Sequence, residues 1–312
     1  MFMDEIISKI KSMYKSNCDE KVYLLIKLSD KTGFFMSSGK LLYMEKTINC
    51  GGINASVNTE YLEFIPQVKV VPVSAENQFV EGYYNVLSFK ANLDDENLES
   101  FIRLCIIHTN NRADLTFGQL FDTILNLFQL PKEQEYKNLI GLYGELAFIQ
   151  FIYENYKSNI CKYWHKSGSK SKYDFAITNC NFEVKTITTE DMIVNIKHKQ
   201  IFNTDRNYLV VVQLSKDRGI TLEQLINNLY EQESFNEEYQ FWIKLEKEKR
   251  RISNIDMQNE KFCIEVVNIY DANQINIFEH VPNSITDLTY KLDMNCFPKL
   301  DHKRLNMVFK EI

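Results

Sequence analysis

The order of apolar and polar positions divides the chain into a strand-rich first part and a second part that mixes helices with strands. Between residues 21 and 90, short apolar runs are separated by turn-forming sequences such as Asp-Lys-Thr-Gly and Gly-Gly, which predicts a mostly antiparallel β lobe. The predicted strands are KVYLLIKLS, GFFMSS, KLLYMEK, VNTEYLEFI, VKVVPVS and YYNVLSFK. Ahead of them, residues 4–16 place isoleucines at helical spacing, so we expect an amphipathic helix that packs on the protein; contact with a membrane surface is the alternative.

Helical periodicity returns after Asp94 and then alternates with strand signals to the end of the sequence. The continuous branched apolar run YLVVVQLS (208–215) predicts a buried central strand. We place a domain boundary at Asn110-Asn111 and expect an α+β or α/β protein. Its β-rich N-terminal lobe covers residues 1–110, and a domain with a mixed central sheet flanked by helices covers residues 111–312. Predicted helices cover 94–108, 114–129, 134–156, 221–231 and 235–250, and further strands cover 261–270, 275–278 and 285–294.

Composition narrows the classes of protein that the chain can belong to. With 312 residues, 45% of them hydrophobic, it can bury a sizeable core. A net charge of −6 argues against a protein that coats nucleic acid generally, so such contacts would come from local patches. The seven cysteines form no CxxC pair, and no apolar run approaches the ~20 residues of a membrane span or forms a signal peptide. We therefore expect reduced thiols, no membrane and a cytoplasmic location.

The chemistry of the sequence centres on YDFAITNCNFEVKTI (173–187), which reads as a tight β-hairpin turning at Asn179-Cys180-Asn181. If the loop has two or four residues, residue 178 faces 181 and Asp174 faces Lys185. Asp174, Glu183 and Lys185 then share one face, with Cβ atoms about 5 Å apart across the strands. A loop of three residues would instead send Asp174 to the other face.

Two neighbouring carboxylates and one amine suit the hydrolysis of phosphodiesters. The carboxylates of Asp174 and Glu183 repel each other, and a hard cation such as Mg²⁺ relieves that repulsion, with the backbone carbonyl of Val184 as a further oxygen ligand. A bound cation lowers the pKa of a coordinated water, while Lys185 orients that water or holds the phosphate. The structural alternative is a cross-strand salt bridge between Asp174 and Lys185, worth at most ~1 kcal/mol at an exposed site.

A second unusual acid lies in the predicted third helix, within GLYGELAFIQFI (141–152). Glu145 falls inside the apolar stripe of this helix, where a carboxylate costs several kcal/mol unless it is paired or binds a metal. We expect it to face the cation of the hairpin; a bond to a tyrosine or lysine in a packing seam is the alternative. Gly141 and Gly144 thin the helix surface, which would let it lie close to a sheet.

Other residues around the hairpin are weaker candidates. The sequence CKYWH (161–165) predicts a strand in which Trp164 packs, and the basic loop KSGSKSK (166–172) with Lys170 and Lys172 either contacts phosphates or is a solvated turn. Thr186 lies on the face opposite Lys185, so packing is preferred to substrate binding. His198 either contacts phosphate, acts as an acid or base, or is a surface histidine. The charge run KLEKEKRR favours a solvated helix face over a DNA clamp.

The order of these features resembles the PD-(D/E)XK nuclease superfamily: a helix with Glu, a strand with Asp, a turn, a strand with Glu-x-Lys and an apolar strand. Tyr173 stands in place of the nominal proline. The sequences GLYGELAFI, YDF and FEVKT, together with Trp164 and the two-lobed layout, are similar to a bacterial family named for its PD-(D/E)XK motif. Genes of that family lie beside methyltransferase and ATPase genes in phage-defence or restriction-type clusters.

The resemblance implies a restriction-endonuclease-like core and a Mg²⁺-dependent endonuclease that hydrolyses DNA, with Mn²⁺ able to substitute. Asp174 and Glu183 would ligate the metal, Glu145 would complete or hydrate its shell, and Lys185 would position the attacking water. DNA and proteins of a defence system are the implied partners. A homodimer is implied too, because cutting both strands generally requires two active sites. The alternative is a nuclease-like subunit that binds DNA or acts as a scaffold without cleaving, using the β lobe as an interaction platform.

Overall fold

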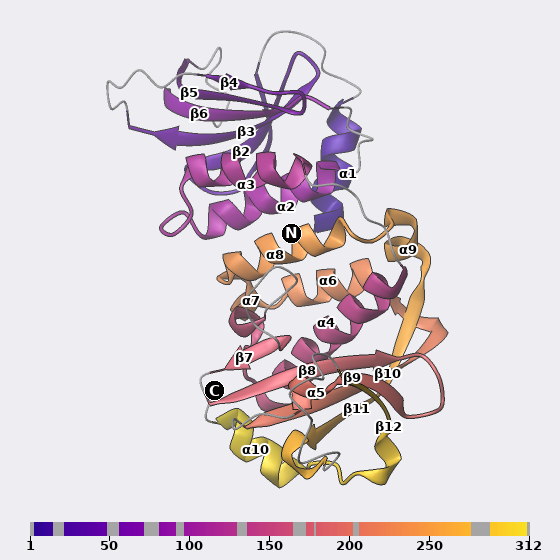
Figure 1. Ribbon diagram of the computed structural model, residues 1–312. Helices are drawn as coiled ribbons and strands as arrows, with labels where there is room; N and C mark the ends of the chain where they lie inside the picture. Colours follow the sequence, from indigo (N-terminus) through magenta and orange to yellow (C-terminus); the bar gives the residue numbers. More distant parts are fainter. Residues whose placement is uncertain are drawn as a thin grey trace. The chain divides into compact units, whose positions relative to one another are not determined.

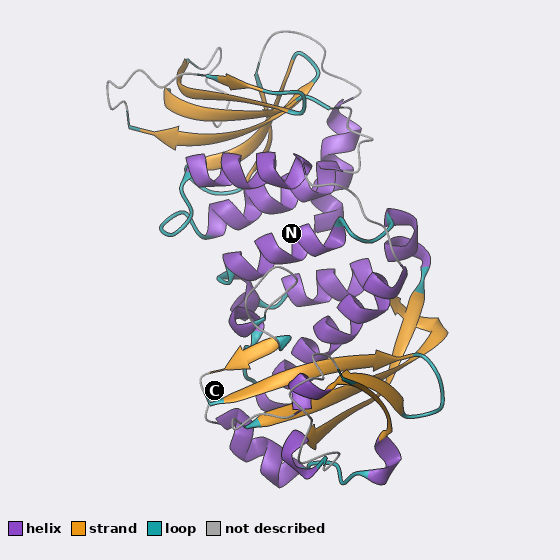
Figure 2. Cartoon of the chain, in the orientation of Figure 1, coloured by secondary structure: helices purple, strands orange, loops and turns teal. Residues whose placement is uncertain are grey.

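The chain forms two compact units, Met1–Pro131 and Lys132–Ile312. The computed structural model describes residues 3–14, 22–48, 56–71, 81–91, 97–129, 136–164, 173–177, 179–201, 206–275 and 288–310. Helices and strands are both abundant in the described residues, as the prediction of an α+β protein requires (Figures 1 and 2). No helix among these residues is long and apolar enough to cross a membrane.

The first unit contains a six-stranded sheet in the order β1-β2-β3-β6-β5-β4. Every neighbouring pair in this sheet is antiparallel, which confirms the predicted antiparallel lobe. Alternate side chains point to opposite faces, so Tyr43 and Phe34 face the helices while Phe35 and Met44 belong to a second cluster on the other face. The strands are β1 (Tyr23–Lys27), β2 (Thr32–Ser37), β3 (Lys40–Thr47), β4 (Val57–Asn58), β5 (Leu62–Val70) and β6 (Gly82–Phe89).

Strand β5 differs from its prediction because it continues through a proline. The pattern predicts one strand in VNTEYLEFI and another in VKVVPVS, but β4 is only two residues long and β5 runs on to Val70. The pairing of β5 with β6 shifts between Ile65 and Val68, and Gln67 has a φ of 54°. Pro66 lies in this bulge, where a missing N–H does not interrupt a regular ladder.

Helices α2 (Asn97–Asn110) and α3 (Phe117–Gln129) lie against one face of this sheet (Figure 1). Phe64 of β5 contacts Phe117 of α3 at 5.5 Å between ring centroids, and Phe89 of β6 contacts Phe101 of α2 at 5.2 Å. Because α3 shares this core, the division of the chain falls beyond α3 and not at residue 110. In α1 (Met3–Tyr14), the side chains of Ile6, Ile7 and Ile10 are buried, as expected for a packed helix.

The second unit is built on a four-stranded sheet in the order β11-β10-β8-β7. Strands β8 and β10 are parallel and the other neighbours are antiparallel, so the sheet is mixed as predicted. Strand β10 is central, but it continues well past the predicted end. A separate pair joins β12 to β9. The strands are β7 (Phe175–Ile177), β8 (Cys180–Ile187), β9 (Ile193–Lys197), β10 (Asn207–Thr221), β11 (Lys261–Asp271) and β12 (Thr289–Asp293).

Helix α4 (Tyr136–Tyr156) packs on one face of this sheet through a small residue. A Cβ atom on Gly144 would lie 1.8 Å from Oγ1 of Thr186, so the helix backbone rests directly on β8. Phe148 one turn later contacts Phe182 at 5.5 Å between ring centroids. The prediction of close approach is therefore confirmed for Gly144 and wrong for Gly141, which would meet nothing within 4 Å.

The remaining helices include some that the pattern predicts and some that it does not. The strand predicted at 161–165 is wrong over the described residues 161–164, where Cys161–Tyr163 form a 3-10 helix and Trp164 forms an isolated bridge to Phe175. The charge run is also less solvated than expected, because Glu246 and Lys249 are buried. The helices are α5 (His198–Ile201), α6 (Leu222–Tyr230), α7 (Glu233–Asn236), α8 (Tyr239–Lys249), α9 (Asn254–Asn259) and α10 (His302–Lys310). The predicted caps at 94–95 and most of the predicted strand at 275–278 lie outside the described residues.

Candidate functional site

The hairpin of β7 and β8 carries the candidate catalytic residues. Ile177 pairs with Cys180, so the hairpin closes one residue earlier than in the predicted register, where residue 178 faces 181. Each residue before the turn therefore faces a residue two positions earlier than predicted, and Asp174 comes level with Glu183 and not with Lys185. Because the shift is even, the parity of the prediction is preserved: Glu183 and Lys185 project from one face of β8.

Asp174 lies just before β7, and its carboxylate caps the edge of β8. Its Oδ2 accepts a hydrogen bond of 2.8 Å from the backbone N–H of Val184. In an antiparallel ladder, the N–H and C=O of one residue point to the same neighbouring strand. The carbonyl of Val184 therefore points to the same edge, beyond the first residue of β7. That direction suits the predicted role of this carbonyl as an oxygen ligand.

Glu183 holds two donors on a single carboxylate oxygen. Its Oε1 is 2.5 Å from Nζ of Lys185 and 2.5 Å from Nε2 of Gln200. Glu183 is almost fully buried, whereas the Lys185 side chain is 24% exposed. An ammonium group held by a buried carboxylate loses much of its freedom to rotate. The predicted neighbours Glu183 and Lys185 are thus brought together, with their geometry fixed by a third residue from α5.

Glu145 has a different partner from the one predicted. It is 5% exposed, and its Oε2 accepts a 2.6 Å hydrogen bond from Nε1 of Trp164. The helix that carries it covers the face of β8 from which Phe182 and Thr186 project, opposite to Glu183. The indole N–H meets the cost of burying this carboxylate, which a hairpin cation was expected to meet.

Whether these residues suit a metal ion depends on the oxygen atoms that they can offer as ligands. Within the described ranges, no three His, Cys, Asp or Glu side chains lie close enough to share an ion. Glu145 therefore does not complete a three-carboxylate group with Asp174 and Glu183. Those two carboxylates and the Val184 carbonyl are an all-oxygen set, which fits a hard cation such as Mg²⁺ and not a soft one.

Of the weaker candidates, the structure describes Thr186 and His198. Thr186 is on the α4 side of β8, against Gly144, as its packing alternative requires. His198 is half-buried at the start of α5, and its Nδ1 lies 2.6 Å from the hydroxyl of Tyr290. Lys170 and Lys172 lie outside the residues that the structure describes. The structure therefore places Thr186 apart from Lys185, on the opposite face of the strand.

Sequence reasoning missed Gln200 and the role of Trp164. Gln200 belongs to a four-residue helix between two strands, and neither its type nor its spacing from Glu183 signals a contact. The sequence predicts that Trp164 packs, and it does contact Phe241 at 5.3 Å between ring centroids. The sequence did contain a signal for Trp164. A buried carboxylate needs a hydrogen-bond donor, and the indole N–H of Trp164, upstream of the hairpin, is one.

A mixed sheet with an aspartate at the start of the hairpin and Glu-x-Lys on its second strand is the arrangement of the PD-(D/E)XK class, whose members are generally nucleases. The model of one family matches residues 119–295, more than half of the chain, and is described as "putative PD-(D/E)XK family member (DUF4420)". The chain belongs to this family. Comparison with curated proteins and with solved structures finds no match.

Proposed function

We propose that the protein is a Mg²⁺-dependent endonuclease that hydrolyses DNA phosphodiester bonds in the cytoplasm, as part of a phage-defence or restriction-type system. The observation that carries the proposal is the hairpin itself. In it, the Asp174 carboxylate accepts a hydrogen bond from the backbone N–H of Val184. On the same strand, the ammonium of Lys185 donates to Glu183, two residues earlier. The membership of the PD-(D/E)XK family supports the same chemistry.

The residues of the hairpin divide the work of hydrolysis. Asp174, Glu183 and the Val184 carbonyl would hold the cation. When bound, it would lower the pKa of a coordinated water and neutralise charge on a phosphoryl oxygen. Lys185 orients the attacking water or holds the phosphate, because its ammonium is fixed beside Glu183 and its side chain remains partly exposed. Gln200 positions Glu183 through the shared oxygen.

Cleavage of a supercoiled plasmid in the presence of Mg²⁺ tests the proposal. We expect wild-type protein to nick the plasmid, and Lys185→Ala to slow nicking by about 100-fold or more, as for the loss of an electrostatic stabiliser. Lys261→Ala is the matched control, because Lys261 is an exposed lysine at the start of β11. Equal nicking by wild type and Lys185→Ala, or nicking without a metal, would contradict the mechanism.

One observation favours a second function, that of a scaffold subunit that does not cleave. The donors on Glu183 and the indole on Glu145 stabilise these acids without an ion. Titration of the protein with Mn²⁺ in a calorimeter separates the two functions independently of any substrate. Binding that is lost in Asp174→Asn supports the nuclease, whereas no binding at millimolar Mn²⁺ supports the scaffold.

A further inference from the structure

The first unit contains a hollow of about 660 Å³ that the proposed nuclease chemistry does not use. It lies on the helix side of the sheet, where β3, β5 and β6 meet the turn between α2 and α3. Its polar lining comes from Glu45, Asn85, His108, Arg112 and Thr116, and its apolar lining from Phe64, Pro66, Leu115 and Phe117. A volume of this size with a few polar groups on an aromatic lining is typical of a small-molecule site.

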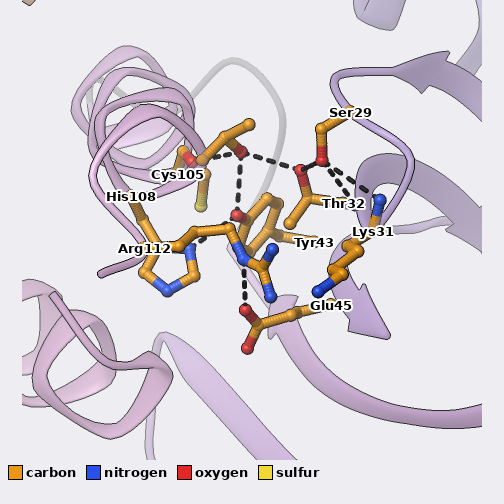
Figure 3. Close-up of polar contacts among 9 residues, drawn as sticks. Ser29, Lys31, Thr32, Tyr43, Glu45, Cys105, His108 and Arg112 are labelled. Atoms are coloured by element: carbon orange, nitrogen blue, oxygen red, sulfur yellow. Dashed lines mark hydrogen bonds and ion pairs between the residues drawn. The ribbon is translucent and has the colours of Figure 1, made fainter. Parts of the chain in front are cut away.

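The hydrogen bonds behind His108 determine which of its nitrogens carries the proton (Figure 3). The hydroxyl of Thr109 donates to the carbonyl of Cys105 at 3.1 Å. With that proton used, the 2.9 Å contact between Thr109 and Tyr43 needs the proton of Tyr43. The 2.7 Å contact between Tyr43 and Nδ1 of His108 then needs an N–H on the imidazole. Nε2 is therefore the unprotonated nitrogen, and it presents a lone pair.

The charges of the lining balance one another. Burial and the nearby guanidinium of Arg112 lower the pKa of His108 to about 4, so the imidazole is neutral at ordinary pH. Nε of Arg112 lies 2.6 Å from Oε1 of Glu45, which offsets its positive charge (Figure 3). The lining thus carries one positive and one negative side chain. A phosphate or another bare anion finds no excess of positive charge here.

The apolar part of the hollow includes two aromatic rings, the half-buried Phe64 and the buried Phe117. The rings of Phe64 and Phe117 are 5.5 Å apart with an interplanar angle of 33°. Phe117 also stacks on Tyr43, with ring centroids 5.7 Å apart and an interplanar angle of 6°, and it lies perpendicular to the ring of His108 at 5.6 Å and 88°. Since Phe117 and His108 are held by this stack and by the hydroxyl chain, their positions are set before a ligand binds.

From these features we propose that the hollow binds a nucleobase. A base is planar and uncharged, and carries both donors and acceptors on one edge. Its face would lie on the Phe64–Phe117 surface, and an N–H of the base would donate to Nε2 of His108. Arg112 and Asn85 supply the donors for its acceptor atoms, and Glu45 accepts a further N–H. The base comes either from a free nucleoside or from a nucleotide that has left the stack of a DNA strand.

Two measurements on the full chain distinguish these sources. Calorimetric titration with adenosine, guanosine, cytidine and thymidine tests the free nucleoside. A duplex with one 2-aminopurine opposite an abasic site tests the displaced base, because 2-aminopurine fluoresces more strongly once unstacked. We expect at least one of the two readouts to respond in wild-type protein. Response of the nucleosides alone assigns a free ligand, and a rise in fluorescence assigns a base in DNA.

Variants of the lining make the test specific. In His108→Asn, the amide nitrogen takes the place of Nδ1 and keeps the bond to Tyr43, while the acceptor at Nε2 is lost. We expect binding to weaken by about tenfold, as for one hydrogen bond. Asn85→Asp, which replaces amide donors by a carboxylate and keeps the Oδ1 that accepts from Gln67, should weaken binding in a variant with the core intact. Lys69→Ala, at an exposed position of β5, is the control.

Three results would overturn the proposal. The first is that no nucleoside binds at millimolar concentration and the 2-aminopurine signal does not change. The second is binding that His108→Asn and Asn85→Asp leave unaltered while both variants keep the circular dichroism spectrum of the wild type. The third is saturable binding of inorganic phosphate that displaces the nucleoside, because a neutral lining should not select an anion. None of these depends on whether the second unit cleaves DNA.

Discussion

At the scale of single residues, the buried bond between Glu145 and Trp164 is the sharpest test of the site. An acid in an apolar helix stripe must have a partner, and its sequence position predicts that need. The identity of the partner depends on how α4 meets the segment before β7, which no local pattern contains. The partner is the indole of Trp164, whose Nε1 lies 2.6 Å from Oε2 of Glu145, and both side chains are buried.

Trp164→Phe should therefore destabilise the second unit. Phenylalanine fills most of the indole volume but cannot donate, so a buried carboxylate loses a donor, at a cost of about 1–3 kcal/mol in the free energy of unfolding. Urea unfolding followed by circular dichroism measures the change. Trp242→Phe is the matched control: Trp242 is equally buried, but its Nε1 donates to the neutral carbonyl of Phe235. The loss should be smaller there, and an equal or smaller loss for Trp164→Phe would contradict a charged acceptor.

Gln200 offers a second prediction at this scale, and it rests on the proposed metal site. Gln200→Leu removes one of the two donors on Oε1 of Glu183 and leaves Lys185 in place. We expect Mn²⁺ binding to weaken by about 10–100-fold, the usual effect of losing a residue that orients a metal ligand. Calorimetry measures it. Gln213→Leu removes a glutamine that bonds only to backbone carbonyls near residues 189–190 and should leave the affinity unchanged.

At the scale of elements, the hairpin shows how much of a site the sequence can predict. Period-two alternation predicts that Glu183 and Lys185 share a face, and any turn with an even number of residues preserves this. The register itself depends on where the turn closes, and it closes one residue earlier than expected. The face on which α4 packs is a long-range contact. For that reason the sequence predicts that the carboxylate of Glu145 needs a partner, but not that the indole of Trp164 donates to it.

The two glycines of α4 provide the matched pair for this packing. Gly144→Ala would place Cβ 1.8 Å from Oγ1 and 2.9 Å from Cβ of Thr186, so the helix must move off β8. We expect a loss of about 1–3 kcal/mol or more in the free energy of unfolding, as for other overpacked cores. Gly141→Ala meets nothing within 4 Å and should instead stabilise the helix by about 0.5–1 kcal/mol.

Urea unfolding of both glycine variants measures whether α4 rests on β8 at Gly144 and is free of such a contact at Gly141. Thr186→Ala in the Gly144→Ala background removes Oγ1 and Cγ2, two of the three nearest atoms, and should recover part of the loss. Similar stabilities of Gly141→Ala and Gly144→Ala would show that α4 does not rest on β8 at Gly144.

At the scale of the whole molecule, the chain forms two compact units, and a buried histidine in the first unit should make its stability depend on pH. In the first unit, His108 is buried and neutral, with its pKa lowered to about 4 from an ordinary value of 6.5. Between these values the unfolded chain binds a proton and the folded chain does not. The free energy of unfolding therefore falls as the pH is lowered from 6.5 to about 4, by roughly 3 kcal/mol at most. Above pH 6.5 the stability from keeping this histidine neutral is fully present.

The positions of the tryptophans make this acid effect visible in one unit at a time. The chain has two tryptophans, Trp164 and Trp242, and both belong to the second unit, Lys132–Ile312. Indole fluorescence thus reports on the second unit alone, whereas far-ultraviolet circular dichroism reports on both. Lowering the pH from 7 to 4.5 should lower the urea midpoint at which the first unit unfolds. Circular dichroism should show this shift, and indole fluorescence should not. His108→Asn has no group to titrate at this position, so the same transition should depend less on pH, while any carboxylates that titrate in this range contribute equally to both proteins. If wild type and His108→Asn lose stability in parallel, or if both probes shift together, acid does not act through the histidine of the first unit.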